Sequence, residues 1–312
     1  MNTVIDIAAL VLVSCVMWLL SRLPERPAML LARSIVWVAL LLLPRSHRVA
    51  RRNLELVFPN LDQARREQIR RESYRVLALN LLDFARLPKL NGVRAREMID
   101  FEPAGKIVRQ LRQEFPDVGI LIPMMHFGSV EIFAQFTALL LEPTAILARG
   151  FGFPRLDRWW NSRRELFGSE MFDRKGGYKE MVARLSRGQS VGILADQNVK
   201  ANHAVFVPFF GIQAATTKSI ALAAIQTGSP ILVAACWQSS FSRYDLDVER
   251  IAAETAEDSG LSNGERVAKI TERINAAFER IIRAHPEQWF WIHRRWKTRP
   301  PGEAETLYGN RA

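Results

Sequence analysis

The sequence predicts an α/β fold, with a mixed, mostly parallel sheet flanked by helices and an N-terminal transmembrane helix. Two observations carry this prediction. From about residue 104 onward, short apolar runs of strand length alternate with longer amphipathic stretches, a pattern that favours a parallel sheet covered by helices. Near the N-terminus, an apolar run approaches the roughly 20 residues that a membrane-spanning helix needs.

The N-terminal apolar run covers residues 7–20 and is followed, not preceded, by arginines. The positive-inside rule then places the N-terminus outside the membrane and the rest of the chain in the cytoplasm. A lipoprotein cleavage box at 12–15 is a minor alternative, because the apolar run continues beyond it.

A second apolar stretch, residues 28–43, is short for a span and is set apart by Pro24 and Pro27. We expect an interfacial helix that lies along the membrane, with a two-helix hairpin as the alternative. The expected division of the chain is a transmembrane anchor at 1–22, an interfacial helix and basic juxtamembrane linker at 23–50, the main domain at 51–300 and a flexible tail at 301–312.

Signals at their ends support the expected helices and strands. Asp62 is a good N-cap for a helix over 62–87, and Gly188, Gly228 and Pro286 end the helices over 179–186, 217–227 and 265–285. Two further helices are expected over 104–115 and 155–166. The expected strands are 118–125, 145–148, 191–195, 205–210, 231–237 and an antiparallel edge strand, 244–248.

The charge balance points to an acidic partner. The 312-residue chain has a net charge of +11, and arginine supplies 35 of its 43 cations. Between Arg22 and Arg75, twelve arginines face five acids. Guanidinium groups favour phosphates and carboxylates, so the partner classes are anionic lipid, nucleic acid or an acidic carrier protein. The alternative is a solvated, solubilising surface. Two cysteines without a metal or disulfide spacing, Cys15 and Cys236, fit a reducing compartment.

One hexapeptide combines a histidine and a glutamate at the end of an expected strand. His126 follows the strand 118–125, and Glu131 opens the apolar segment after it. Gly128 between them suits a turn. If His126 lies in the turn and Glu131 in the helix, the carboxylate can fix the imidazole tautomer and stabilise its protonated form. The alternative is a structural histidine at a strand end.

Two other stretches carry polar or aromatic side chains. Asp196 and Gln197 follow the strand 191–195, which predicts a pocket at the carboxyl edge of the sheet, although a helix N-cap is the alternative for Asp196. The aromatic run 206–210 is better explained as core than as a channel. The segment 286–300 mixes tryptophans with arginines. That mixture suits nucleic-acid stacking or a membrane interface, and the apolar N-terminus favours the membrane.

The order of these elements resembles the late acyltransferases of lipid A biosynthesis, the lauroyl and myristoyl transferases, in the wider lysophospholipid (glycerol-phosphate) acyltransferase-like group. The resemblance covers nearly the whole chain and rests on the following elements. They are the apolar anchor, residues 51–59, His126–Gly128 with Glu131, Asp173–Lys175, Ala195–Gln197, 205–211 with 214–217, and 287–300. The chain departs from the family at Ser129-Val130 and Gly152-Phe153, which leaves acceptor and chain-length specificity open.

The resemblance implies an enzyme that moves a fatty acyl group from acyl carrier protein to a hydroxyl of a lipid A precursor. Its catalytic pair would be His126 and Glu131, and its oxyanion or substrate-binding residues would be Arg164, Arg149 and Asp196. The absence of a G-x-S-x-G motif favours direct transfer over an acyl-enzyme. Acyl carrier protein, an anionic glycolipid and the membrane are the expected partners, and nucleic acid is not.

The implied location is the cytoplasmic side of a bacterial inner membrane. We expect no metal, because the five histidines lack ligand spacing, and no cofactor beyond the acyl-carrier co-substrate. Two alternatives remain open. The acceptor could be another lipid, such as a lysophospholipid, an aminolipid or a glycosylated inositol lipid. From a different class, the chain could be a basic, membrane-tethered binding protein without catalysis.

Overall fold

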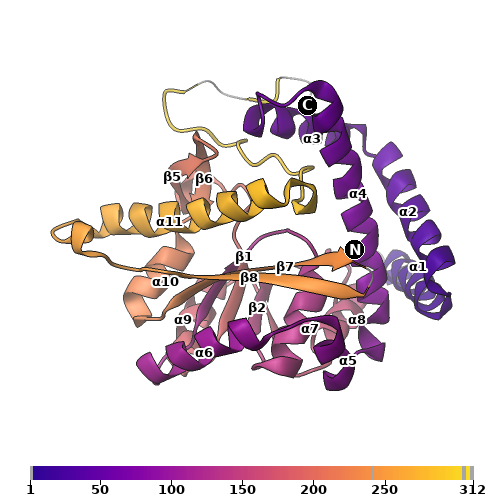
Figure 1. Ribbon diagram of the computed structural model, residues 1–312, viewed down its shortest axis with the longest axis horizontal. Helices are drawn as coiled ribbons and strands as arrows, with labels where there is room; N and C mark the ends of the chain where they lie inside the picture. The colour runs from indigo at the N-terminus through magenta and orange to yellow at the C-terminus, as the bar shows by residue number, and fades with distance from the viewer. Residues whose placement is uncertain (1–2, 241, 304–306, 310–312) are drawn as a thin grey trace.

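A six-stranded sheet forms the centre of the computed structural model, which describes residues 3–240, 242–303 and 307–309 (Figure 1). The strands are β1 (Leu121–Met124), β2 (Ala145–Ala148), β3 (Glu170–Asp173), β4 (Val191–Leu194), β5 (Ala204–Phe209), β6 (Ile212–Thr217), β7 (Ile231–Ser240) and β8 (Arg243–Ile251). The sheet order is β3-β2-β4-β1-β7-β8, and β5 and β6 form a separate hairpin. Neighbouring strands from β3 to β7 are parallel and β8 is antiparallel, so the predicted mixed, mostly parallel sheet is confirmed.

Helices surround the sheet, and their ends follow the local signals. Asp62 caps α4 (Gln63–Arg86) by accepting from Arg65 N at 2.7 Å, and Gly228 ends α10 (Ser219–Thr227) at a φ of 71°. The α-helices are α1 (Thr3–Arg22), α2 (Glu25–Leu41), α3 (Pro44–Val57), α4 (Gln63–Arg86), α5 (Gly92–Met98), α6 (Glu102–Glu114), α7 (Val130–Leu140), α8 (Pro154–Arg164), α9 (Gly177–Leu185), α10 (Ser219–Thr227) and α11 (Asn263–Ala284). Short 3₁₀ helices are η1 (Leu87–Lys89), η2 (Ala201–His203), η3 (Ala256–Asp258) and η4 (Pro286–Gln288).

Two strands were not expected from the sequence. β3 is four residues long and begins and ends with an acid, so it carries no apolar run. β6 includes Thr216 and Thr217, which we expected to open the next helix. They pair instead with Val205 and Ala204 of β5, because the turn at Phe210-Gly211 folds β6 back on β5.

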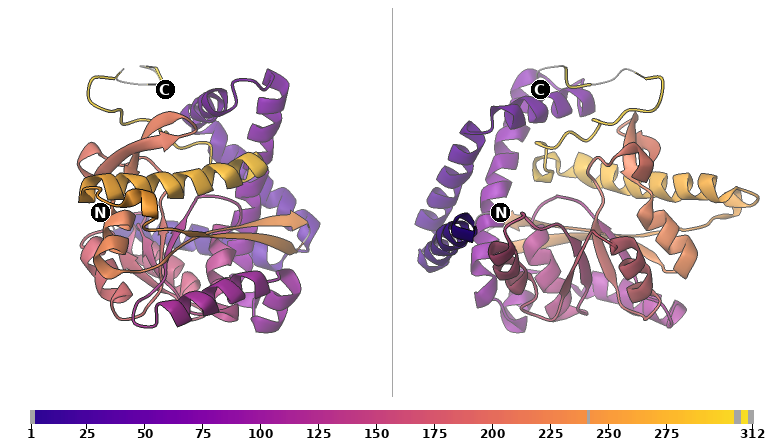
Figure 2. Two further views of the ribbon diagram at one scale, coloured as in Figure 1. Left: turned by 60° about the vertical axis from the view of Figure 1, so that its left-hand side comes forward. Right: turned by 180° about the vertical axis from the view of Figure 1, so that it is seen from behind.

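The sheet separates two hydrophobic cores. Along β7, residues 231, 233, 235 and 237 join one core and residues 232, 234 and 236 join the other, as the two-residue period of a strand requires. Helices α9, α10 and α11 pack into the first core, and α4, α6 and α7 into the second. The views of Figure 2 show α11 and α6 on opposite sides of the sheet.

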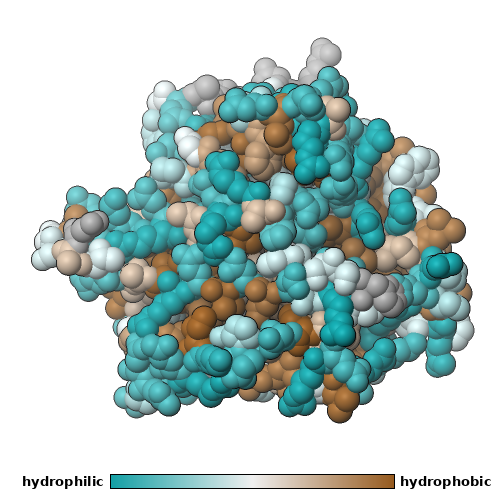
Figure 3. All heavy atoms as spheres, in the orientation of Figure 1, coloured by the Kyte–Doolittle hydropathy of each residue, from teal (hydrophilic) through white to brown (hydrophobic). Residues whose placement is uncertain are grey.

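The N-terminal helices carry most of the exposed apolar surface. In the described residues, α1 is the one helix that by itself is long and apolar enough to cross a membrane, and α2 and α3 pass only as a pair bent by 94°. Most exposed large apolar side chains lie between residues 4 and 43. Figure 3 shows brown spheres among the teal ones on the side formed by α1 and α2. This surface suits membrane anchoring.

One face of α1 and α2 nevertheless packs on the domain. Met17 and Leu20 of α1 and Ala28 and Ala32 of α2 are buried in the second core. Asp6 of α1 is 3% exposed and accepts from the backbone nitrogen of Arg155, the second residue of α8, at 3.1 Å. A carboxylate at a helix N-terminus is favourable, because the first N–H groups of the helix lack partners.

The expected basic linker before residue 51 is part of a helix. α3 runs through this boundary, and Val49, Ala50 and Leu54 are buried in the first core. The arginines of this region lie on the opposite face of an amphipathic helix. α3 therefore packs into the first core with residues from both sides of the expected boundary.

The C-terminal segment is buried, contrary to two expectations. Trp289, Trp291 and Trp296 are at most 3% exposed, so these indole rings are core rather than membrane-interface residues. Arg295 is fully buried and donates to Ala215 O at 3.0 Å and Thr216 Oγ1 at 2.6 Å. The three indole N–H groups donate to protein oxygens, which are Asp196 Oδ2, Pro286 O and Phe209 O. Arg295 Nε is buried without a hydrogen-bond partner among the described residues.

The expected flexible tail contains a core residue. Tyr308 is 6% exposed, and its hydroxyl donates to Asn53 Oδ1 at 2.7 Å and accepts from Trp296 N at 3.1 Å. Residues 304–306 and 310–312 lie outside the described residues. At Tyr308, the expectation of a loose tail does not hold.

Tyr308→Phe should lower the free energy of unfolding by about 1–2 kcal/mol, because it leaves buried partners of the hydroxyl unsatisfied. Chemical denaturation measures this loss. Tyr178→Phe is the matched control, because the Tyr178 hydroxyl bonds to Gln226 at an exposed position. Equal stabilities of both variants and the unchanged chain would contradict a docked tail.

Candidate active site

The imidazole of His126 stands in a tightly held loop between β1 and α7. Gly128 in this loop has a φ of +53°, and a Cβ there would lie 2.2 Å from Cys236 O. Only glycine meets both constraints. The loop is bonded to β7 through Ser129 N and Cys236 O at 2.9 Å, and to α4 through Asn80 Nδ2 and Gly128 O at 2.5 Å. The predicted turn at Gly128 is therefore confirmed.

Asp196 is the carboxylate that contacts His126. It follows β4, the strand next to β1, and its Oδ1 lies 2.8 Å from His126 Nδ1. Its Oδ2 accepts from His126 N at 3.0 Å and from Trp289 Nε1 at 2.8 Å. Asp196 is 2% exposed. Because an ionised carboxylate can only accept, Nδ1 carries the proton, and Nε2 of the neutral ring is left as a proton acceptor.

Glu131 pairs with an arginine instead of with His126. Its Oε2 accepts from Arg164 Nε at 2.9 Å, and its Oε1 accepts from Arg164 Nη2. Glu131 stands in the first turn of α7 and Arg164 in the last turn of α8, and both positions suit their charges. The expectation that Glu131 orients the imidazole is therefore corrected, because Asp196 occupies the Nδ1 side of the ring.

The two carboxylates act on His126 in the same direction. Burial of the ring lowers the pKa of His126, but the charge and hydrogen bond of Asp196 raise it by more, and the charge of Glu131 adds a further increase. The net pKa of His126 lies above its ordinary value of 6.5. Burial raises the pKa of Asp196, but His126 and Trp289 outweigh burial, so the pKa of Asp196 is lowered and its carboxylate stays ionised.

A large cleft opens beside this histidine. It has a volume of about 960 Å³ and is lined by His126, Glu131, Arg149 and Arg164, whereas Asp196 lies behind the imidazole. His126 is 30% exposed in its side chain, so the ring reaches the cleft. The structure thus brings all five predicted residues to one place at the carboxyl edge of the sheet.

The cleft is cationic on one part of its wall and apolar on another. Glu131 is the one carboxylate among its lining residues. Sequence reasoning named Arg174 and Lys175 only within a motif and missed the lysines from the β4–β5 and β6–α10 connections. The six cations of the wall are Arg149, Arg164, Arg174, Lys175, Lys200 and Lys218. The apolar part includes Met124, Ile146, Leu147, Met171, Met181 and Ile193.

His293 has a structural position next to this site. Its Nε2 accepts from Asn198 N at 3.0 Å, and its backbone oxygen accepts from Asn53 Nδ2 at 2.7 Å. Burial, helped by nearby cations, lowers the pKa of His293 to about 4. The ring therefore stays neutral with its acceptor nitrogen occupied, which is a structural role.

A family model of bacterial lipid A biosynthesis acyltransferases matches residues 3–298. This chain belongs to that family. It is 28% identical over 295 residues to the lipid A biosynthesis palmitoleoyltransferase of Escherichia coli K12, covering 94% of this chain and 92% of that protein. It is also 28% identical over 296 residues to the lauroyltransferase of the same strain, covering 92% and 90%.

A lipid A biosynthesis myristoyltransferase of the same organism is 27% identical over 262 residues, which cover 83% of this chain and 78% of that protein. The three relatives differ in the acyl group that their names print, so the likeness supports acyltransferase chemistry more strongly than any one chain length.

Asp196→Asn should lower the pKa of His126 below 6.5, because the raising charge is removed while burial remains. Glu131→Gln should lower this pKa by less, and Arg164→Gln should raise it. NMR titration of labelled histidine measures all three. Asp173→Asn, at an exposed carboxylate, is the control and should leave the pKa unchanged. An unshifted His126 in Asp196→Asn would disprove the assigned pairing.

Proposed function

We propose that this protein transfers a fatty acyl group from an acyl carrier protein thioester to a hydroxyl of a lipid A precursor. The observation that carries the proposal is the Asp196-bound imidazole, whose Nε2 is free to face a cationic and apolar cleft. A base in such a cleft suits a substrate with both phosphate and acyl groups. The family, whose relatives are named as lipid A acyltransferases, supports the same reaction class.

In the proposed reaction His126 is the general base. Its Nε2 takes the proton of the acceptor hydroxyl as that oxygen attacks the thioester carbonyl carbon. The tetrahedral intermediate then collapses, the carbon–sulfur bond breaks, and the leaving thiolate receives the proton from His126. Asp196 is a positioning residue: it holds the Nδ1 tautomer and stabilises the imidazolium that forms between the two proton transfers.

Arg164 is the proposed stabiliser of the oxyanion. Its Nε and Nη2 bind Glu131, and Nη1 has no hydrogen bond to any residue that the structure describes. A cation held by a carboxylate needs little reorganisation when negative charge develops beside it. Glu131 then acts by fixing Arg164 and by raising the pKa of His126, and not by holding the imidazole.

The other cations of the cleft are proposed to bind the anionic parts of the substrates. Arginine and lysine side chains recognise phosphates by charge-assisted hydrogen bonds. Arg149 and the Arg174–Lys175 pair suit phosphate groups of a glycolipid or of the carrier's prosthetic arm, and the apolar wall suits an acyl chain. The exposed apolar surface of α1 and α2 supports attachment to the inner membrane, with the cleft on its cytoplasmic side.

His126→Ala should reduce acyl transfer by about 10²- to 10⁴-fold, which is the usual contribution of a general base, and should leave membrane association intact. The assay supplies acyl carrier protein thioesters of several chain lengths with a panel of acceptor lipids, and mass spectrometry detects the product. His285→Ala is a control, because that ring stacks on Trp237 away from the cleft lining.

Full activity of the His126 variant would remove the proposed base. A mass increase confined to a lysophospholipid, an aminolipid or a glycosylated inositol lipid would replace the lipid A precursor as acceptor. Membrane association without transfer to any acceptor would favour a binding protein.

The pH profile of kcat/KM should rise with pH through the pKa of His126, because only the neutral imidazole accepts a proton. That pKa is raised in the folded chain, so the rising limb should lie above pH 6.5. Asp196→Asn should move the limb to lower pH and reduce the maximal rate, by up to the order of 10⁴-fold seen when a histidine base loses its carboxylate. A limb that stays in place in this variant would contradict the assigned roles.

A further inference from the structure

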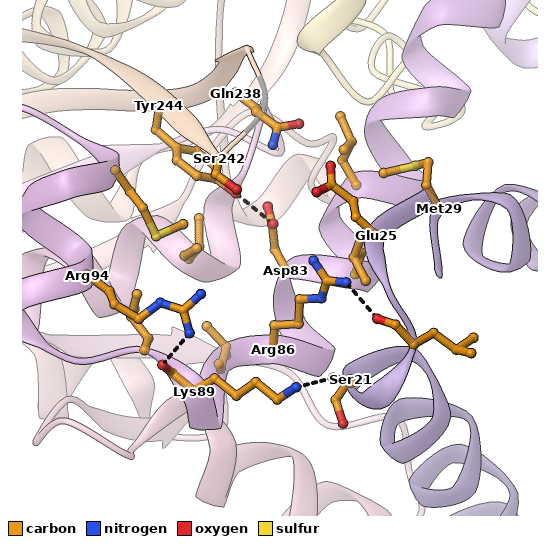
Figure 4. Close-up of a pocket in the computed structure, with 17 residues that line it drawn as sticks. Ser21, Glu25, Met29, Asp83, Arg86, Lys89, Arg94, Gln238, Ser242 and Tyr244 are labelled. Atoms are coloured by element: carbon orange, nitrogen blue, oxygen red, sulfur yellow. Dashed lines mark hydrogen bonds between the residues drawn. The ribbon is translucent and has the colours of Figure 1, made fainter. Parts of the chain in front are cut away.

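A second cavity lies where the N-terminal helices join the domain. It has a volume of about 240 Å³ and is bordered by the α1–α2 connection, the end of α4, η1, α5 and the turn between β7 and β8 (Figure 4). Its apolar wall includes Met29, Leu79, Leu82, Met98 and Ile132. It shares no lining residue with the active-site cleft, so the proposed reaction does not use it.

Three cations converge on this cavity. Arg86 Nη2 donates to Leu23 O at 3.2 Å, Lys89 Nζ donates to Ser21 O, and Arg94 Nη1 donates to Lys89 O at 3.2 Å. In Figure 4, Arg86 and Lys89 reach toward the α1–α2 connection, and Arg94 approaches from another side. Within the described ranges, none of the three forms an ion pair with a carboxylate, and each keeps further N–H groups that no backbone oxygen uses.

Two carboxylates also line the cavity and do not cancel this charge. Glu25 has no ion pair in the described part of the chain. Asp83 is buried and accepts from the Tyr244 hydroxyl at 2.7 Å, and burial raises the pKa of Asp83 to about 6. With both carboxylates ionised, three cations still leave one uncompensated positive charge, which favours an anion at this place.

The surroundings of the cavity fit a lipid surface. Trp18 and Leu19, just before the α1–α2 connection, are 61% and 41% exposed, and Val93, next to Arg94, is 67% exposed. Arg22 lies 5.9 Å from the Trp18 ring centre. Exposed tryptophan with nearby arginine is typical of the depth at which lipid head groups lie. The cavity lies at the C-terminal end of α1, and the ends of membrane-spanning helices are where the phosphates of a bilayer are found.

We propose that this cavity binds the phosphodiester head group of an anionic membrane lipid, through Arg86, Lys89 and Arg94. The lipid is distinct from the acyl acceptor and holds the N-terminal helix pair at the membrane surface. Its phosphate oxygens accept from the free N–H groups of the three cations, and its acyl chains lie along the exposed apolar faces of α1 and α2. Free phosphate offers the same oxygen acceptors to the three cations, and the experiment therefore compares the lipid with inorganic phosphate.

The full-length chain in neutral detergent is titrated with dihexanoyl phosphatidylglycerol, and native mass spectrometry counts the bound molecules. Arg94→Gln should weaken one binding event about tenfold, the effect of losing one charge-assisted hydrogen bond, and Lys89→Gln should do the same. Arg96→Gln is the matched control. It lies on the same helix, is exposed and donates to Gly92 O at 3.3 Å, but does not line the cavity.

Arg174→Gln distinguishes lipid binding in the cavity from binding in the active-site cleft, because Arg174 lines only the cleft. It should leave the event lost in Arg94→Gln unchanged. Dihexanoyl phosphatidylcholine and inorganic phosphate should each bind at least tenfold more weakly than the anionic lipid.

Equal binding by wild type, Arg94→Gln and Lys89→Gln would overturn the proposal, and so would equal affinity for the zwitterionic lipid. Inorganic phosphate that binds as tightly as the lipid would overturn the lipid assignment. Because Arg94 is exposed, its variant should keep the unfolding temperature of the wild type without lipid. A chain that binds the anionic lipid in the cavity but transfers no acyl group would contradict the proposed function and leave the lipid site supported.

Discussion

The buried carboxylate of Asp196 is the group on which the architecture of the site depends. An ionised carboxylate that is 2% exposed would be very costly without partners. It receives three hydrogen bonds, two from His126 and one from Trp289. These bonds join the end of β4, the loop after β1 and the C-terminal segment. The same contacts keep one nitrogen of the imidazole protonated and leave the other as an acceptor. The hydrogen bonds that stabilise the buried carboxylate therefore also set the tautomer of His126.

Two carboxylates and two basic side chains meet at this edge of the sheet and form two separate pairs. Asp196 takes His126, and Glu131 takes Arg164. Had Glu131 held the imidazole, Arg164 would have lacked its partner and Asp196 would have been a buried charge with fewer donors. The observed arrangement pairs all four groups and leaves His126 Nε2 and Arg164 Nη1 without a hydrogen-bond partner among the described residues. These two nitrogens are the ones that the proposed acyl transfer uses.

Positive charge and apolar surface occur together at two separate places. In the active-site cleft, six cations face an apolar wall, which matches a substrate that carries phosphates and acyl chains. At the junction of α1 and α2, three cations border a smaller apolar cavity. The exposed side chains of Trp18 and Leu19 stand just before the α1–α2 connection that borders the second place. Cations and apolar side chains are therefore neighbours both in the cleft and at the junction of the N-terminal helices.

The sequence by itself determined the local structure and the chemical class. Apolar runs, helix caps and turn residues identified β1, β2, β4 and β7, the turn at Gly128 and the apolar N-terminal helix. These elements could be predicted because each depends on residues that are neighbours in the sequence. The tertiary structure decided which side chains contact one another. His126 and Asp196 are 70 residues apart and meet only because β4 lies beside β1 in the sheet. Likewise, Tyr308 reaches Asn53 across 255 residues, and three tryptophans become core. Spacing along a chain does not encode strand order, so local reasoning assigned His126 to the nearer carboxylate of Glu131, while packing across the sheet selected Asp196.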